Sequence, residues 1–144
     1  MGRILGVDFG ERRVGIALSD PTGTIAQPLT TIVRRHGKRP PVAPLARLAR
    51  EHDVDAIALG LPLTPEGDDS DWTREVRGFG DKLRERTGLP VHLIDERMTS
   101  ARAERAVRSL GLKKRERERK SRVDLAAAVL ILQAFLDRSG PDEE

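Results

Sequence analysis

The order of the apolar segments along the chain constrains its fold more than any other feature. Two short apolar runs open the sequence, and the turn residues between them predict an antiparallel β-hairpin. A third run follows, and then helical spacing of apolar residues alternates with further apolar runs. A strand meander followed by such alternation predicts an α/β domain with a mixed sheet whose first three strands are antiparallel. The expected strands cover residues 3–8, 13–18, 25–33, 55–60 and 91–95, and the expected helices follow Pro41 and cover 72–87, 99–110 and 121–137.

The length of 144 residues suits one domain, because single cores commonly occupy about 100 to 150 residues. An RNase H-like fold is the simplest arrangement that fits this order of elements. We therefore expect one RNase H-like domain over residues 1–138, with residues 139–144 as a frayed tail.

Several classes of protein are excluded by what the sequence lacks. There is no cysteine, which excludes disulfides, thiolate zinc sites and cysteine nucleophiles, so any metal must bind to oxygen or histidine. The apolar run at the amino terminus is too short for a signal peptide, and no run approaches the length of a membrane span. We expect a soluble cytoplasmic protein that does not associate with membranes.

Positive charge is concentrated in one segment, residues 113–122. This segment holds seven basic and two acidic residues, a local net charge of +5, whereas the whole chain carries only +3. Such a concentration is typical of a surface that binds phosphates. The alternative is a solvated connector whose Arg and Glu residues pair with each other.

Three acidic residues occupy positions where ordinary structure gives little reason for an acid. Asp8 ends the first expected strand, Glu96 follows the strand 91–95, and Asp124 lies at the start of the last expected helix. Sites in α/β sheets gather at the carboxyl ends of strands. Asp124 heads an otherwise apolar helix face, formed by Ala127, Ala128, Ile131 and Phe135. Burying a carboxylate is costly unless it has a partner or a cation, so we expect the three acids to converge.

Each acid also has an ordinary interpretation. Asp8 would stabilise a turn in Asp-Phe-Gly. Asp124 would complete a capping box with Ser121. Glu96 would belong to an exposed ion pair at a strand end, worth at most about 1 kcal/mol.

Four motifs, in order along the chain, resemble those of the YqgF/RuvX family. The resemblance extends from Arg3 to about Leu136, and the joint order and spacing of the motifs are highly specific. The motifs are Gly6–Gly10 with Arg13–Ala17, Leu59–Pro62, Asp95–Ser100 with Ala103 and Glu104, and Asp124–Ala127 with Ile131–Gln133.

This resemblance implies an RNase H-like fold, a relationship to RuvC-type Holliday-junction resolvases, and a nuclease role in maturing the 5′ end of the 16S rRNA precursor. By position, Asp8, Glu96 and Asp124 match the acidic triad of the family. The chain departs from the family pattern after Gly67, where acidic residues fill the loop 68–71. That departure puts in doubt any substrate contact made by this loop.

Three carboxylates supply hard oxygen ligands, which select Mg²⁺ or Mn²⁺. We therefore expect a metal-dependent nuclease that cuts structured nucleic acid, RNA or branched DNA, and that acts as a homodimer if it cuts a junction symmetrically. The alternatives are a Holliday-junction resolvase-like DNA endonuclease and an RNA-binding ribosome-assembly factor that does not cut. The guanidinium of Arg97 would hold the scissile phosphate, although an ordinary surface role is equally compatible with the sequence. The other expected nucleic-acid contacts are Lys113, Lys114, Arg115, Lys120 and Arg122.

Overall fold

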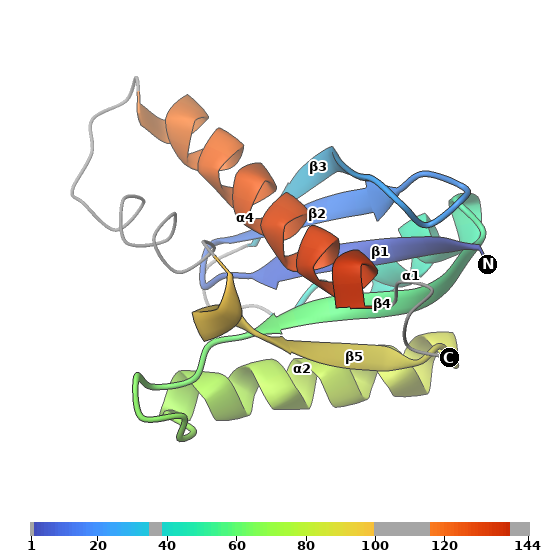
Figure 1. Ribbon diagram of the computed structural model, residues 1–144. Coiled ribbons are helices and arrows are strands. Elements are labelled where there is room, and N and C mark those ends of the chain that lie inside the picture. The colour runs from blue at the N-terminus through green and yellow to red at the C-terminus, as the bar shows by residue number, and fades with distance from the viewer. Residues whose placement is uncertain (1, 35–38, 100–115, 139–144) are drawn as a thin grey trace.

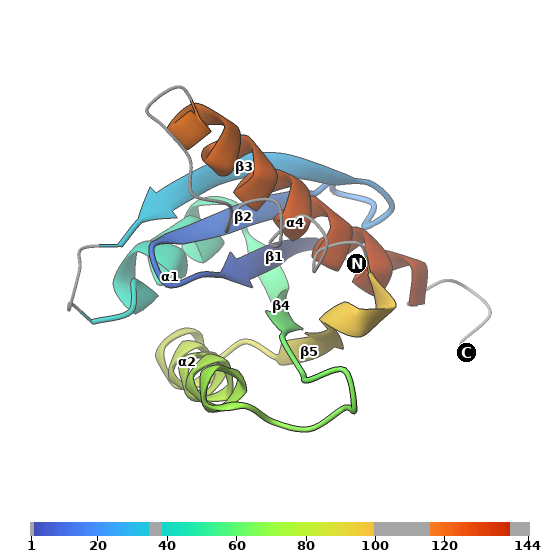
Figure 2. The same cartoon turned by 90° about the vertical axis from the view of Figure 1, so that its left-hand side faces the viewer.

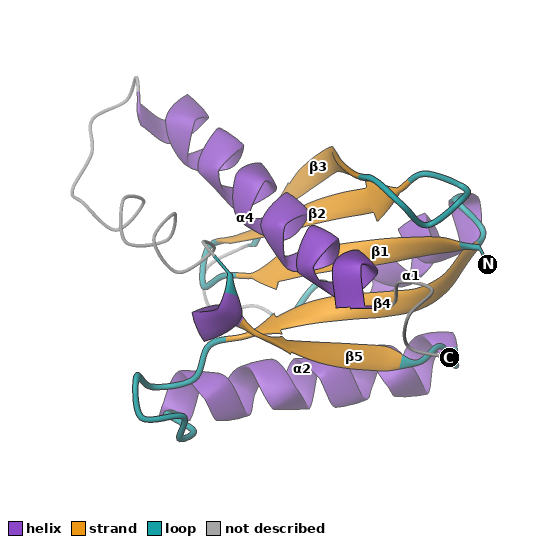
Figure 3. Cartoon of the chain, in the orientation of Figure 1, coloured by secondary structure: helices purple, strands orange, loops and turns teal. Residues whose placement is uncertain are grey.

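A five-stranded mixed sheet with helices on both faces makes up the fold (Figures 1 and 3). The computed structural model describes residues 2–34, 39–99 and 116–138, with the side chains of the last helix described from Leu125 onward. In chain order the elements are β1 (Arg3–Phe9), β2 (Arg13–Ser19), β3 (Ala26–Val33), α1 (Val42–Glu51), β4 (Val54–Leu61), α2 (Asp71–Thr87), β5 (Val91–Asp95), the 3₁₀ turn η1 (Glu96–Met98) and α4 (Glu116–Arg138).

The strand order is β3-β2-β1-β4-β5. β1 pairs antiparallel with β2, and β2 pairs antiparallel with β3. β1 also pairs parallel with β4, and β4 pairs parallel with β5. The predicted α/β class, the mixed sheet and the three antiparallel opening strands are confirmed.

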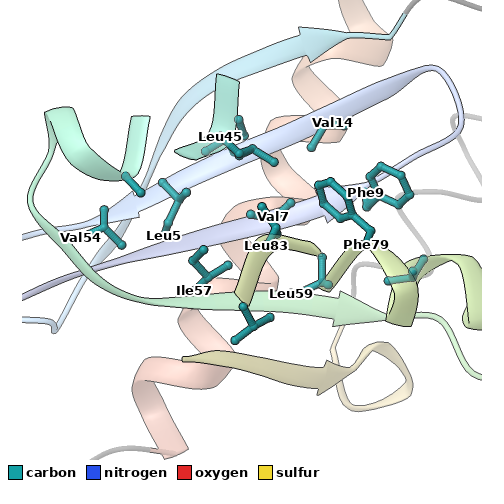
Figure 4. Close-up of a cluster of buried hydrophobic side chains, with 14 of the residues drawn as sticks. Leu5, Val7, Phe9, Val14, Leu45, Val54, Ile57, Leu59, Phe79 and Leu83 are labelled. Carbon is teal, nitrogen blue, oxygen red and sulfur yellow. The ribbon is translucent and has the colours of Figure 1, made fainter. Parts of the chain in front are cut away.

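The two faces of the sheet carry separate apolar clusters, because alternate residues of a strand point to opposite faces. On one face Leu5, Val7 and Phe9 of β1 pack with residues of α1 and α2 (Figure 4). On the other face, here called the α4 face, Ile4 of β1 packs with Leu132 of α4. The first strand therefore contributes to both halves of the core.

Local signals in the sequence explain where α2 begins and ends. The side chain of Ser70 accepts a hydrogen bond from the backbone N–H of Thr73, and the Thr73 hydroxyl accepts one from the backbone N–H of Ser70, which is a capping box. At the other end, Gly88 has a left-handed conformation with φ of 71°, which costs glycine little. The helix predicted over 72–87 is confirmed to within one residue.

One boundary was predicted wrongly. α4 begins at Glu116 and not at Ser121, so the charged residues 116–122 belong to the helix instead of connecting two helices. Arg, Lys and Glu are good helix formers, and Glu at 116 and 118 precedes a basic residue by four positions, a spacing that favours a helix. Asp124 consequently lies inside α4, and the interpretation of Ser121 and Asp124 as a capping box is wrong.

Apart from Thr99, which follows η1, the helix predicted over 99–110 lies outside the described residues, and so does the tail 139–144. Within the described ranges, no helix combines the length and the apolar character that a membrane span requires.

Candidate active site

Asp8 and Glu96 are both buried on the α4 face of the sheet. Asp8 is 0% exposed and Glu96 is 1% exposed. Asp8 is four positions after Ile4 in β1, so the two side chains point to the same face, and Ile4 packs in the cluster beneath α4. Glu96 is two positions after Ile94, a member of the same cluster. Strand alternation directs the Asp8 carboxylate to this face. Glu96 belongs to η1, directly after β5, and its carboxyl group lies on the same face, close to Gly60 and Ile131.

Gly60 of β4 lies between the two acids. Val7 pairs with Leu59, so the next position of β1, Asp8, lies beside Gly60, and Gly60 itself pairs with Ile94. A Cβ atom at Gly60 would lie 3.2 Å from the carboxyl carbon of Glu96 and 2.5 Å from Cδ1 of Ile131. The absence of a side chain at this position therefore makes room for the Glu96 carboxylate, and β1 and β5 stand about 10 Å apart across β4.

A second glycine lets α4 approach the sheet. A Cβ atom at Gly6 would lie 2.5 Å from Cβ of Leu132 and 3.1 Å from the carbonyl oxygen of Ala128. Ala127 and Ala128 are fully buried, so small residues face each other across this contact. Small side chains on α4 and on β1 therefore allow the helix to lie close to the sheet.

The backbone of Asp124 lies in α4, one helical turn before Ala128 and thus about 6 Å along the axis. The amino-terminal half of α4 lies on the side of the molecule where β1 and β4 end (Figure 1), the side viewed in Figure 2. Because the side chain of Asp124 lies outside the described ones, the convergence of the three acids stays a prediction. Among the side chains that the structure does describe, no group of three acids or histidines is arranged to hold a metal.

The ordinary interpretations of Asp8 and Glu96 do not fit the structure. Asp8 lies within β1, whereas the turn that follows is closed by the N–H of Gly10, which donates to the carbonyl of Arg13 at 2.9 Å. Glu96 is buried and is not part of an exposed ion pair. That ion pair joins its two neighbours instead, with Nη2 of Arg97 2.7 Å from Oδ2 of Asp95.

Arg97 belongs to a local clamp on the loop between β4 and α2. Its Nη1 donates to the carbonyl of Pro65 at 3.3 Å, and its Nε and Nη2 donate to the Asp95 carboxylate. The hydrogen bonds that Arg97 donates to the Asp95 carboxylate raise the pKa of its guanidinium. Gly67, at φ of 89°, leaves room for it, since a Cβ there would lie 2.8 Å from Nη1. The role of Arg97 as a phosphate contact stays a prediction. In the structure its guanidinium is hydrogen-bonded to Asp95 and Pro65.

The basic segment is described only in part. Lys113, Lys114 and Arg115 lie outside the described residues, and Lys120 and Arg122 lie in α4 with side chains outside those described. The structure therefore places the backbone of the last two on the helix that carries Asp124, within four residues of it.

The structure also identifies Gly60 as a residue of the site, which the sequence analysis missed. An available signal was a glycine inside an otherwise continuous apolar strand, which often marks close approach of another group. The apolar run that contains Gly60 also predicts the strand itself.

Comparison with known proteins agrees with this arrangement. The profile of the RuvX family, described as Holliday junction resolvase, matches residues 2–138. Relatives named "Putative pre-16S rRNA nuclease" include one from Koribacter versatilis, 46% identical, with 99% of this chain and 92% of the relative covered. Another, from Roseiflexus sp., is 43% identical, with 94% of each chain covered.

Among solved structures, RuvC of Thermus thermophilus in complex with a Holliday junction substrate superposes with a TM-score of 0.54 over 97% of both chains, at 14% identity. This likeness confirms the RNase H-like fold. The family profile matches nearly the whole chain, and the relatives from Koribacter and Roseiflexus are 46% and 43% identical to it over almost their full length. The chain belongs to the RuvX family.

Proposed function

We propose that this chain is a divalent-metal-dependent nuclease that hydrolyses phosphodiester bonds of structured nucleic acid, in the cytoplasm, during 5′-end processing of the 16S rRNA precursor. The names of its relatives support the substrate and the reaction. The observation that carries the proposal is the burial of two carboxylates, Asp8 and Glu96, on one face of the sheet around a glycine.

The residues at this position suit a hard divalent cation. Asp8 and Glu96 provide carboxylate oxygens, the donors that Mg²⁺ and Mn²⁺ prefer. Two buried carboxylates disfavour each other's ionised form, and a cation between them would offset that cost. Asp8, Glu96 and Asp124 are the residues that would hold it.

The chemistry supplied by such a cation is activation of water and neutralisation of charge on the leaving oxygen. The chain itself contributes the positions of the acids. β1 and β5 are held by pairing to β4 on both sides of Gly60, and α4 packs against the same strands. This packing keeps solvent away from Asp8 and Glu96 and fixes their side chains before substrate arrives.

The segment 113–122 would lie along the nucleic-acid backbone, with Lys113, Lys114, Arg115, Lys120 and Arg122 as its phosphate contacts. Its net charge of +5 supports this role. Replacing Lys113, Lys114, Arg115 and Arg117 by Ser should flatten the dependence of binding on salt and weaken binding to all sequences alike. Unchanged salt dependence would leave the segment as a solvated helix end.

A second candidate function is cleavage of four-way DNA junctions, favoured by the family description as Holliday junction resolvase. Incubation of the pure protein with labelled precursor rRNA, single strands and a synthetic junction, each with Mg²⁺, Mn²⁺ or EDTA, separates the candidates. Cleavage of precursor rRNA alone supports the first function, and cleavage of the junction alone supports the second. Binding without cleavage of any substrate would identify a non-catalytic assembly factor.

Three substitutions test the site itself. Asp8→Asn, Glu96→Gln and Asp124→Asn should each abolish cleavage while leaving the fold nearly intact, because each removes one charged ligand but little volume. Glu85→Gln serves as a matched control, since Glu85 is exposed on α2, on the opposite face of the sheet. Full activity in any two of the three site variants would refute the assignment.

Thermal unfolding gives a readout that does not depend on cleavage. A cation that binds the folded protein stabilises it by about 2.7 kcal/mol at a concentration one hundred times its Kd. Mg²⁺ or Mn²⁺ should therefore raise the melting temperature of the wild type more than that of Asp8→Asn. Equal shifts in both proteins would mean that the ion binds elsewhere.

A further inference from the structure

Arg13, the first residue of β2, lies on the same face of the sheet as Asp8. Val14 and Ile16 pack into the cluster against α1 and α2, so the alternate positions of β2 point to the α4 face. Ala17 confirms this, because it packs in the cluster beneath α4. Arg13 is two positions before Gly15 and thus faces the same way as Ala17.

Within β1 and β2, the position between Asp8 and Arg13 on this face is a glycine. Asp8 pairs directly with Gly15, which has no side chain, and Arg13 is the diagonal neighbour on the same face. Diagonal neighbours in an antiparallel pair are about 7 to 8 Å apart, which a long side chain can span. The backbone of Arg13 is also fixed on both sides, because its carbonyl accepts from the N–H of Gly10 and its position pairs with Val33 of β3.

Arg13 is partly exposed, at the edge of the described core. Val33, its partner on the same face, is 70% exposed. Four other arginines, at positions 74, 77, 84 and 97, pair with aspartates. Among the described residues Arg13 makes no ion pair.

The positions of Arg13 and Arg97 point to different tasks. Arg97 is held by Asp95 and by the loop between β4 and α2, whereas Arg13 lies diagonally beside the buried carboxylate of Asp8, at the start of β2. A guanidinium at that place can bind two oxygens of one phosphate while the neighbouring carboxylates act on the adjacent bond.

We propose that Arg13 binds a backbone phosphate of the nucleic-acid substrate beside Asp8. This inference rests on the proposed function and adds to it a substrate contact outside the segment 113–122. The rival explanation is that Arg13 only offsets the negative charge of Asp8 within the protein.

The experiment measures binding of a fluorescent precursor rRNA hairpin and of a four-way junction in EDTA, over a series of salt concentrations. Wild type, Arg13→Gln, Arg13→Lys and Arg86→Ala are compared. Arg86 is the matched control, because it is exposed near the end of α2, on the opposite face of the sheet. Melting temperatures are measured in parallel to establish that each variant is folded.

Loss of one phosphate contact should weaken binding by Arg13→Gln about tenfold and reduce the salt slope by about 0.7 to 0.9. Arg13→Lys should keep the slope and lose part of the affinity, since an ammonium group cannot bind a phosphate through two parallel hydrogen bonds. Arg86→Ala should match the wild type.

Unchanged affinity and slope in Arg13→Gln would overturn the inference. A change confined to its melting temperature, or to its stabilisation by Mg²⁺, would overturn it as well and support the charge-offset explanation. If the wild type binds none of the substrates, the proposed function fails. If the wild type binds and Arg13→Gln binds equally well, only the inference fails.

Discussion

Replacement of Gly60 by Ala tests whether the missing side chain at this position of β4 is what makes room for the Glu96 carboxylate. The added methyl group would lie 2.5 Å from Cδ1 of Ile131, 3.1 Å from Cγ1 of the same residue and 3.2 Å from the carboxyl carbon of Glu96. The first distance requires Ile131 to move, and the third requires Glu96 to shift by a few tenths of an ångström. Because Ile131 is fully buried, its movement strains the core.

Overpacking of this kind costs about 1 to 3 kcal/mol. A loss of about 2 kcal/mol lowers the melting temperature by roughly 4 to 8 °C in a chain of about this size. Urea unfolding followed by circular dichroism measures the free energy of unfolding directly. Gly78→Ala is the control, because a Cβ at Gly78 meets nothing within 4 Å and the residue lies inside α2. That variant should be more stable than the wild type by about 0.5 to 1 kcal/mol.

A double-mutant cycle assigns the cost to one contact. Ile131→Val removes Cδ1, the atom that the new methyl group would approach most closely, and by itself should cost about 0.5 to 1.5 kcal/mol. In the Gly60→Ala background the same change should cost almost nothing, giving a coupling energy of about 1 kcal/mol or more. The double variant should still be stabilised by Mg²⁺ less than the wild type, because Glu96 remains displaced. Additive losses in the cycle would refute the reasoning.

Three further predictions concern the turns around the sheet. Ser70→Ala should cost about 1 kcal/mol of unfolding free energy in urea, since it removes the cap of α2; an unchanged urea midpoint would show that the cap is dispensable. Gly67→Ala and Gly88→Ala each force a side chain into a left-handed conformation, which should lower the unfolding free energy by about 1 to 2 kcal/mol. Gly67→Ala should cost more, because it also displaces Arg97. Equal losses of unfolding free energy in the two variants would show that the contacts of Arg97 add no stability. Hydrogen bonds from the backbone N–H of Ile25, the Thr22 hydroxyl and the N–H of Thr24 lower the pKa of Asp20 to about 2. The wild type should therefore be more stable than Asp20→Asn above about pH 4, and this difference in unfolding free energy should decrease as the pH falls towards 2. A difference that persists at pH 2 in acid unfolding would contradict this.

The sheet and its strands could be predicted because their signals are local. The short apolar runs of β1 and β2, the turn between them and the glycine after α2 each fix an element from a few neighbouring residues. The start of α4 could not be predicted in the same way. Its first turns are highly charged and carry no apolar stripe, so periodicity began only where the helix meets the sheet.

The candidate site was predictable in its residue types and only partly in its geometry. The positions of Asp8 and Glu96 at strand ends followed from the pattern, and both residues are buried. Their convergence with Asp124 stays a prediction. The sequence could not show that Glu96 is buried while Asp95 and Arg97 form the ion pair. All three adjacent residues carry charge, and the 3₁₀ turn after β5 decides which side chain points inward. The contribution of Gly60 depends on contacts with α4 and η1, which are remote in sequence from β4.

The position of α4 has a consequence for how the protein matures on the ribosome. Ile4, near the first residue made, shares a cluster with Leu132 and Leu136, which are made last among the described residues. Until α4 emerges, Ile4, Ala58 and Ile94 lack the α4 residues that they pack with among the described residues. A nascent chain that stops before α4 therefore presents an apolar sheet face to its neighbours, the kind of surface from which aggregates start. This half of the core is therefore complete only after α4, the last described helix, has been made.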